Sequence, residues 1–109
     1  MKKSMQLTVT VATLLAFATA GIAKEESKAK SGEELFKTHC AVCHPDGGNI
    51  VNPKKTLHKK DREQNNVKGT KDIMEKMRNP GTGMTTFDKV TIPDKDAKKI
   101  AQYILKTFN

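Results

Sequence analysis

Two cysteines and a histidine that stand close together are the residues of this chain with the clearest chemical meaning. They form the string Cys40-Ala41-Val42-Cys43-His44. Cys-x-x-Cys-His is the pattern at which a haem is covalently attached, because two thiols three residues apart can form thioethers with the two vinyl groups of one porphyrin. The following histidine can then ligate the iron. We therefore predict one covalent haem c, attached at Cys40 and Cys43, with His44 as the proximal axial ligand.

Zinc, a redox-active dithiol and an ordinary disulfide are the alternatives for these cysteines. Structural zinc takes four ligands, and the other histidines, His39 and His58, do not stand at a zinc-site spacing. A thioredoxin-like dithiol is expected beside a βαβ pattern, which the sequence lacks. A disulfide would leave the adjacent His44 without a role. Haem attachment is the hypothesis that accounts for all three residues.

The second axial position of the iron has several candidate ligands in the sequence. Met74 and Met77 fall on the apolar stripe of an expected helix, and packing in the core explains them better. His39 precedes Cys40 on the segment already tied to the haem, and we expect it to be exposed. His58 lies in a polar, lysine-rich stretch.

Met84 differs from these candidates because it belongs to no apolar stripe. It follows two glycines in the loop Pro80-Gly81-Thr82-Gly83-Met84, where the backbone is free to approach a flat cofactor closely. We predict Met84 as the distal iron ligand, and Phe87, three residues later, as a wall of the haem pocket.

The first 23 residues have the features of a cleaved secretory signal. Lys2 and Lys3 precede an apolar run over residues 7–20 and then small residues. Small-x-small cleavage sites end at Ala20 and at Ala23, and we favour cleavage after Ala23. The run is shorter than the roughly 20 residues needed to span a membrane. We expect a signal peptide over 1–23, a flexible leader over 24–30 and one domain over 31–109. The product is expected to be a soluble periplasmic protein without stable membrane insertion.

The composition leaves little material for a conventional core. The 109 residues are 36% apolar with a net charge of +8, and without residues 1–23 the charge is +6. Low apolar content with high charge is typical of disordered chains, and small domains bury little surface. A multidomain enzyme is excluded. A covalently held porphyrin, which is large, rigid and mostly apolar, can provide the missing core.

The remaining pattern predicts an all-α fold with long loops and no strands. Ser31 and Glu34 form a capping box for a helix over 32–40. A short helix is expected within 57–66, and Thr70 is expected to cap a helix over 71–78. Residues 45–56 and 84–90 are expected to be loops. The last helix begins near Pro93 and carries apolar residues at helical spacing up to Phe108.

These features together resemble the class I monohaem cytochromes c. The matching features are Gly32-x-x-x-Phe36 ahead of the cysteine motif, the glycine-rich methionine loop at 80–84, and Ile100-Ala101-Gln102-Tyr103-Ile104-Leu105 in the last helix. Residues 47–51 and 55–57 are similar, more narrowly, to the small cytochromes that replace plastocyanin in photosynthesis. Similar monohaem cytochromes occur in metal-reducing bacteria.

The resemblance implies a cytochrome c-like fold of three to four short helices around one haem. It implies that the first and last helices cross, with close approach at Gly32 and a contact sealed by Phe36 and Tyr103. It also implies that Asn49 and Leu57 line the haem pocket.

One departure from the subfamily lies in the methionine loop. The subfamily has Met-Pro-x-Phe, whereas this chain has Met84-Thr85-Thr86-Phe87. A loop without the proline is expected to be less rigid, which opens the way to ligand exchange with Lys76 or Lys89 at high pH.

The expected function is electron transfer and not catalysis. A haem with two side-chain ligands has no open site for a substrate, and the sequence shows no catalytic acid–base pair. We predict a monomeric carrier that cycles between Fe(III) and Fe(II) in a respiratory or metal-reduction chain. Its basic charge suits redox partners with acidic docking surfaces, and solubility of a small exported protein explains the charge equally well. Few aromatic residues and no recognition motif argue against nucleic acid as a partner.

The alternative function is that of a haem-based small-ligand sensor or a peroxidase-like protein with a labile Met84 bond.

Overall fold

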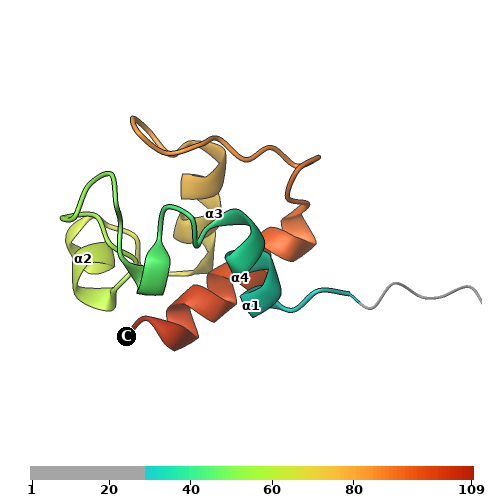
Figure 1. The fold of residues 1–109 in the computed structure, drawn as a ribbon, viewed down its shortest axis with the longest axis horizontal. Helices are drawn as coiled ribbons and strands as arrows, with labels where there is room; N and C mark the ends of the chain where they lie inside the picture. The colour runs from blue at the N-terminus through green and yellow to red at the C-terminus, as the bar shows by residue number, and fades with distance from the viewer. Residues whose placement is uncertain (1–28) are drawn as a thin grey trace, which may run out of the picture.

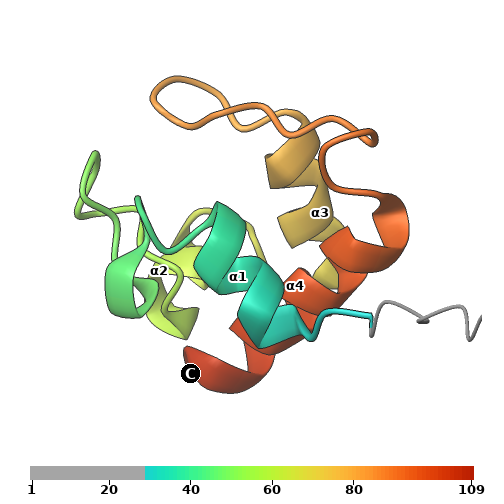
Figure 2. The ribbon, with the colours of Figure 1, turned by 45° about the vertical axis from the view of Figure 1, so that its right-hand side comes forward.

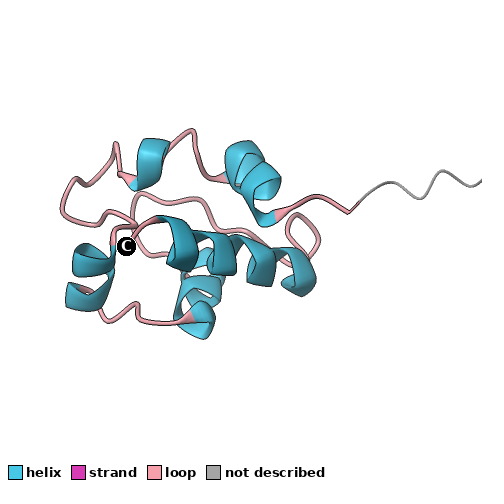
Figure 3. Ribbon diagram, turned by 90° about the horizontal axis from the view of Figure 1, so that it is seen from below, coloured by secondary structure: helices cyan, strands magenta, loops and turns pink. Residues whose placement is uncertain are grey.

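The computed structural model describes residues 29–109, and this part of the chain holds four α-helices, one 3₁₀ helix and no strand (Figures 1 and 3). The elements are α1 (Gly32–His39), η1 (Pro45–Gly47), α2 (Lys59–Gln64), α3 (Thr70–Arg78) and α4 (Asp94–Thr107). The predicted all-α fold is therefore confirmed. The predicted signal peptide and most of the predicted leader lie outside the described residues. Within 29–109, no helix has the length and apolarity to cross a membrane.

Helix α1 begins at the predicted capping box. The Ser31 hydroxyl accepts a hydrogen bond from the Glu34 amide at 3.2 Å, and the Glu34 carboxylate accepts one from the Ser31 amide at 2.8 Å. Two amides that lack a helical partner are thereby satisfied. The helix buries Leu35 and Phe36 on one face and ends at His39, just before the cysteine motif.

Helices α1 and α4 cross at very close range, and Figures 1 and 2 show α4 passing against both α1 and α3. A Cβ atom at Gly32 would collide with the backbone carbonyl of Lys99, so only glycine allows this approach. The Phe36 ring packs against Tyr103 and Phe108, with ring centroids 5.3 and 5.4 Å apart. The close approach and the aromatic seal expected from the resemblance are both present.

The core gathers along α4, whose periodic apolar face is buried as its spacing predicts. Its most buried residues are Ala97, Ile100, Ala101 and Ile104. Helix α3 contributes Ile73 and Met77 from the other side. Ile92 is also buried, at 1% exposure, although it lies in a loop. Sequence periodicity did not single it out because it precedes the first turn of α4.

Two local expectations are corrected by the structure. Thr70 is the first residue of α3 and not its cap. The cap is Gly69, and the Asp72 carboxylate accepts hydrogen bonds from the amides of Lys68 and Gly69 at 2.9 and 3.1 Å. Residues 45–56 are not entirely loop, because Pro45–Gly47 form a turn of 3₁₀ helix.

Replacing Gly32 with alanine is expected to lower the free energy of unfolding by about 2 kcal/mol, because the added methyl group forces α1 away from Lys99. Chemical denaturation followed by circular dichroism would measure the change. Gly69→Ala is the matched control, since a Cβ there meets nothing within 4 Å. An alanine at that helix cap is expected to cost less than about 1 kcal/mol. Equal losses in the two variants would contradict the steric explanation.

Candidate functional site

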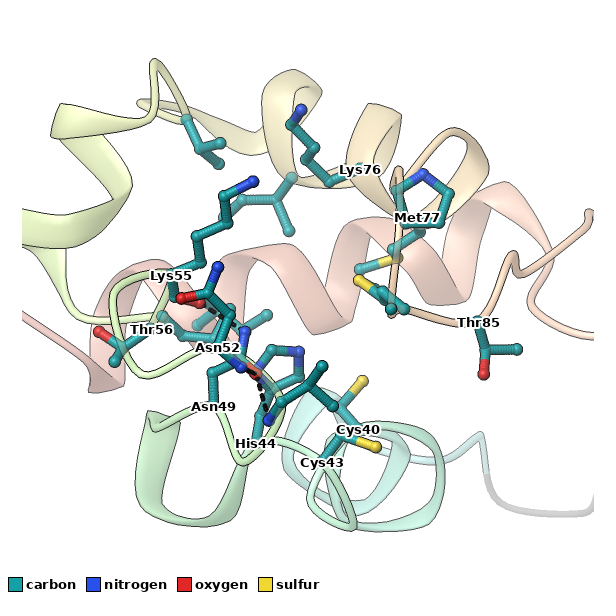
Figure 4. Close-up of a pocket in the computed structure, with 18 of the residues that line it drawn as sticks. Cys40, Cys43, His44, Asn49, Asn52, Lys55, Thr56, Lys76, Met77 and Thr85 are labelled. Carbon is teal, nitrogen blue, oxygen red and sulfur yellow. Dashed lines mark hydrogen bonds between the residues drawn. The ribbon is translucent and has the colours of Figure 1, made fainter.

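A cavity of about 370 Å³ lies between the cysteine motif, the loop over residues 49–57, helix α3 and the loop over residues 80–87 (Figure 4). This volume is within the range of sites that hold small molecules and cofactors. Every residue predicted for the site lines this one cavity: Cys40, Cys43, His44, Asn49, Leu57, Met84 and Phe87. The fold thus brings together residues that are up to 47 positions apart.

The two cysteines lie on a single turn that follows α1. The amides of Cys43 and His44 donate to the Cys40 carbonyl at 3.1 and 2.8 Å, and this turn puts both sulfur atoms on the cavity side (Figure 4). The thiols are not joined in a disulfide. Cys40 is buried, and burial raises the pKa of its thiol to about 11. The pair therefore presents two neighbouring thiols to the cavity.

His44 is buried and held in a defined orientation. Its Nδ1 lies 2.7 Å from the Gly48 carbonyl oxygen. A carbonyl oxygen can only accept, so Nδ1 carries a proton, and in the neutral ring Nε2 is left with its lone pair. This arrangement, in which one ring nitrogen donates to a carbonyl, is the usual one for histidines that ligate a metal through the other nitrogen.

A tight turn after His44 brings the Gly48 carbonyl back to the imidazole. Asp46 and Gly47 both have positive φ, at 52° and 78°, so the chain turns back within η1. A Cβ at Gly47 would overlap the Phe108 ring, which ties this turn to the end of α4.

Met74, Met77 and Met84 differ in their position relative to the cavity. Met84 lines the cavity from the loop, and Met74 does not line it. Met77 is a core residue, at 3% exposure, and also lines the cavity. The amide of Phe87 donates to the Met77 carbonyl at 2.8 Å, so the methionine loop is fastened to α3.

The two histidines outside the motif, His39 and His58, differ in exposure and in their contacts. His58 is exposed, lies outside the cavity lining and packs edge-on against Phe108 with centroids 5.8 Å apart. The expectation that His39 is exposed is wrong. It is half-buried, lines the cavity and packs edge-on against Phe87, with centroids 6.1 Å apart, because the methionine loop folds over the end of α1. Residues 29–109 contain no group of three or more His, Cys, Asp or Glu side chains arranged to hold a metal.

Comparison with known proteins identifies the family. Residues 27–104 match the family model described as cytochrome c oxidase, cbb3-type, subunit III. Cytochrome c6 of Cyanidium caldarium is 32% identical over 97 residues, covering 89% of this chain and 87% of that protein. The chain belongs to the monohaem c-type cytochromes. The resemblance expected from the sequence is thereby confirmed, and so is the cofactor, one covalent haem c with its iron. The cytochrome is an electron carrier.

Solved structures of other cytochromes have the same fold as this cytochrome. OmcF, an outer membrane cytochrome of Geobacter sulfurreducens, has a TM-score of 0.71 at 48% identity, covering 72% of this chain and 100% of that chain. Cytochrome c6C of Synechococcus sp. PCC 7002 has a TM-score of 0.67 at 26% identity, covering 72% and 95%.

The cavity of the cytochrome fits a haem by the chemistry of its lining. One wall offers two thiols and an imidazole with a free Nε2, and another offers a thioether. Apolar side chains from α3, from α4 and from the segments before and after α2 would contact the porphyrin ring: Leu57, Val67, Ile73, Met77 and Ile104. Such a mixture of an apolar lining with a few placed polar groups is typical of cofactor sites.

Arg62 is the site residue that the sequence did not reveal. It lines the cavity at 4% exposure and donates to the carbonyls of Leu57 (2.7 Å) and Phe108 (3.4 Å). No carboxylate in the described part of the chain pairs with it. A buried cation without an anion is unfavourable, and a haem carries two propionates that can balance it. Helix α2 has no apolar residue, so periodicity could not mark Arg62 as facing inward.

Asn49 organises the loop over residues 49–57, which lines the cavity beside His44 (Figure 4). Its side-chain oxygen accepts from the amides of Val51 and Asn52, both at 2.9 Å, and its side-chain nitrogen donates to the Lys55 carbonyl at 2.8 Å. Asn49 therefore shapes the pocket by holding backbone in place.

Proposed function

We propose that this cytochrome is a periplasmic one-electron carrier in a respiratory or extracellular metal-reduction chain, and that it is not an enzyme. Haem c, when bound, supplies the Fe(III)/Fe(II) couple. We propose that Cys40 and Cys43 attach the haem, that His44 is the proximal ligand and that Met84 is the distal ligand. The observation that carries this proposal is the convergence of all four side chains on one cavity.

The assignment of two axial ligands supports the carrier function. The orientation of His44 by Gly48 suits a permanent proximal ligand, and a thioether from Met84 fills the other position without leaving room for a substrate. Thioether ligation favours ferrous iron relative to a second imidazole and so raises the reduction potential. The signal-like residues 1–23 support export to the periplasm. The similarity to an outer membrane cytochrome of Geobacter sulfurreducens supports a role in an exported redox chain.

The cavity entrance offers a surface for transient docking of a redox partner. Val42 and Val51, at 76% and 58% exposure, line the cavity and also face solvent. Lys55 and Lys76 line the cavity as well and are exposed, and Figure 4 shows them on the loop 49–57 and on α3. An apolar rim with flanking cations suits a redox protein with an acidic surface, which it would meet as a monomer.

Lys76 and Lys89 differ in their access to the site. Lys76 lines the cavity, whereas Lys89 lies outside the lining and pairs with Asp94 at 3.3 Å. Of the two lysines, Lys76 is thus the candidate for replacing Met84 at high pH.

The double variant Cys40→Ala/Cys43→Ala is expected to lose covalent haem and native helical structure, because the apolar residues alone do not make a sufficient core. Acid–acetone extraction tests attachment, and circular dichroism tests folding. Cys43→Ala alone is the comparison, since it retains one thioether. A haem-free double variant with native-like circular dichroism would refute the proposal.

Met84→Ala is expected to abolish the weak far-red absorption of thioether-ligated ferric haem and to lower the reduction potential. Met77→Leu is the matched control, because Met77 is the other thioether that lines the cavity and its replacement should leave the band intact. Loss of the band in Met77→Leu and not in Met84→Ala would reverse the assignment. Rapid, complete binding of carbon monoxide by the reduced wild-type protein near neutral pH would indicate a sensor or peroxidase-like protein instead.

Replacing Lys55 and Lys76 together with glutamate is expected to slow electron transfer to a small acidic redox protein by about tenfold at low salt, because steering toward the cavity entrance is lost. Lys98→Glu/Lys106→Glu changes the net charge equally on α4, outside the cavity lining, and should have a smaller effect. Stopped-flow absorbance measures both rates, and high ionic strength should remove the difference. Equal slowing by both pairs would mean that only net charge matters.

A further inference from the structure

Arg78, the last residue of α3, connects three parts of the molecule through one side chain. Its Nη1 donates to the backbone carbonyls of Phe87 at 3.0 Å and Asp88 at 3.2 Å. Its Nη2 donates to the carboxylate of Asp94, at the start of α4, at 2.8 Å. The side chain is only 16% exposed, whereas that of Asp94 is 58% exposed. The guanidinium therefore lies between α3, the end of the methionine loop and α4.

The loop that Arg78 holds is the one that carries Met84. Phe87 follows Met84 by three residues, and α3 binds both of its backbone groups. The Phe87 amide donates to the Met77 carbonyl at 2.8 Å, and the Phe87 carbonyl accepts from Arg78. The loop between α3 and Phe87 contains Gly81 and Gly83, both with positive φ. Its geometry therefore depends on how its ends are held.

An arginine suits this position because of its shape. The planar guanidinium presents several N–H donors in a fixed fork, so it can bind two carbonyls and a carboxylate at once. Hydrogen bonds to a charged group are stronger than those between neutral groups, and a partly buried donor is screened less by water. The Arg78 contact also lowers the pKa of Asp94, with a smaller contribution from Lys89.

We propose that Arg78 is the positioning residue for Met84: by holding the Phe87 and Asp88 carbonyls against α3 and α4, it determines how readily Met84 yields its place at the iron. This inference rests on the proposed role of Met84 as the distal ligand. Arg78 does not contact the cavity itself.

The test compares the affinity of the ferric holoprotein for imidazole, which competes with Met84, by visible absorbance. Arg78→Met is expected to raise the affinity by about tenfold, because the loop loses its charge-assisted hydrogen bonds. Arg78→Lys keeps the charge but cannot reproduce the fork, and should give a similar increase. Lys89→Gln is the matched control, since it removes the other partner of Asp94 without touching the loop carbonyls, and it should leave the affinity unchanged.

A second measurement separates this inference from the proposed function. Amide hydrogen exchange at Phe87 reports the hold on the loop and does not depend on which residue ligates the iron. It should become faster in Arg78→Met, while exchange in α1 stays unchanged. Met84→Ala should bind imidazole at least as tightly as Arg78→Met does.

The imidazole affinities separate failure of the Met84 assignment from failure of the Arg78 role. If Met84→Ala binds imidazole no more tightly than the wild-type protein, Met84 is not the ligand, and both the proposed function and its positioning residue fail. If Met84→Ala binds more tightly but Arg78→Met does not, the proposed function stands and the role of Arg78 is overturned. If Arg78→Met does not fold, Arg78→Lys and Asp94→Asn provide the comparison. Asp94→Asn removes the ion pair but keeps the carbonyl contacts, so it should raise the affinity less than Arg78→Lys.

Discussion

The close contact between Gly32 and the Lys99 carbonyl is the constraint on which the rest of the structure depends. Because the two backbones touch, α1 crosses α4 at one position along each helix, and Phe36 then packs on Tyr103. The end of α1 is fixed by the same contact. The turn that carries Cys40 begins directly after that end, so a steric contact about two helical turns away determines where the thiols stand.

The opposite side of the cavity is built in a different way, by hydrogen bonds and not by helix packing. Helix α3 packs on α4, but the loop after it has little apolar material and two glycines with positive φ. Its position comes from the contacts of Phe87 and Arg78 at its far end. One wall of the site is thus held by buried surface and the other by a few polar contacts. The wall held by polar contacts is the one expected to yield first when the site is perturbed.

Sequence patterns predicted the helices, whose formation depends on neighbouring residues. They missed the burial of side chains whose contacts come from distant parts of the chain. The capping box at Ser31 and the apolar stripe of α4 are local signals, and each led to the observed helix. The cysteine motif is a local signal too, and the comparisons confirm the haem that it predicted. The burial of Arg62 had no such signal, because its partners are the carbonyls of Leu57 and Phe108 and its helix carries no apolar residue. Exposure of His39 was predicted wrongly for the same reason, since the loop that covers it folds back from a distant part of the chain.

A bound haem explains both the low apolar content of the chain and the buried charge of Arg62. A chain that is 36% apolar over its full length leaves a 370 Å³ cavity that its own side chains do not fill, and a buried guanidinium without a carboxylate is costly. A haem addresses both, because its ring is apolar and its propionates are anionic. The core is therefore complete only when the haem ring packs against the apolar side chains of the cavity. The propionates also offset part of the positive charge of the chain.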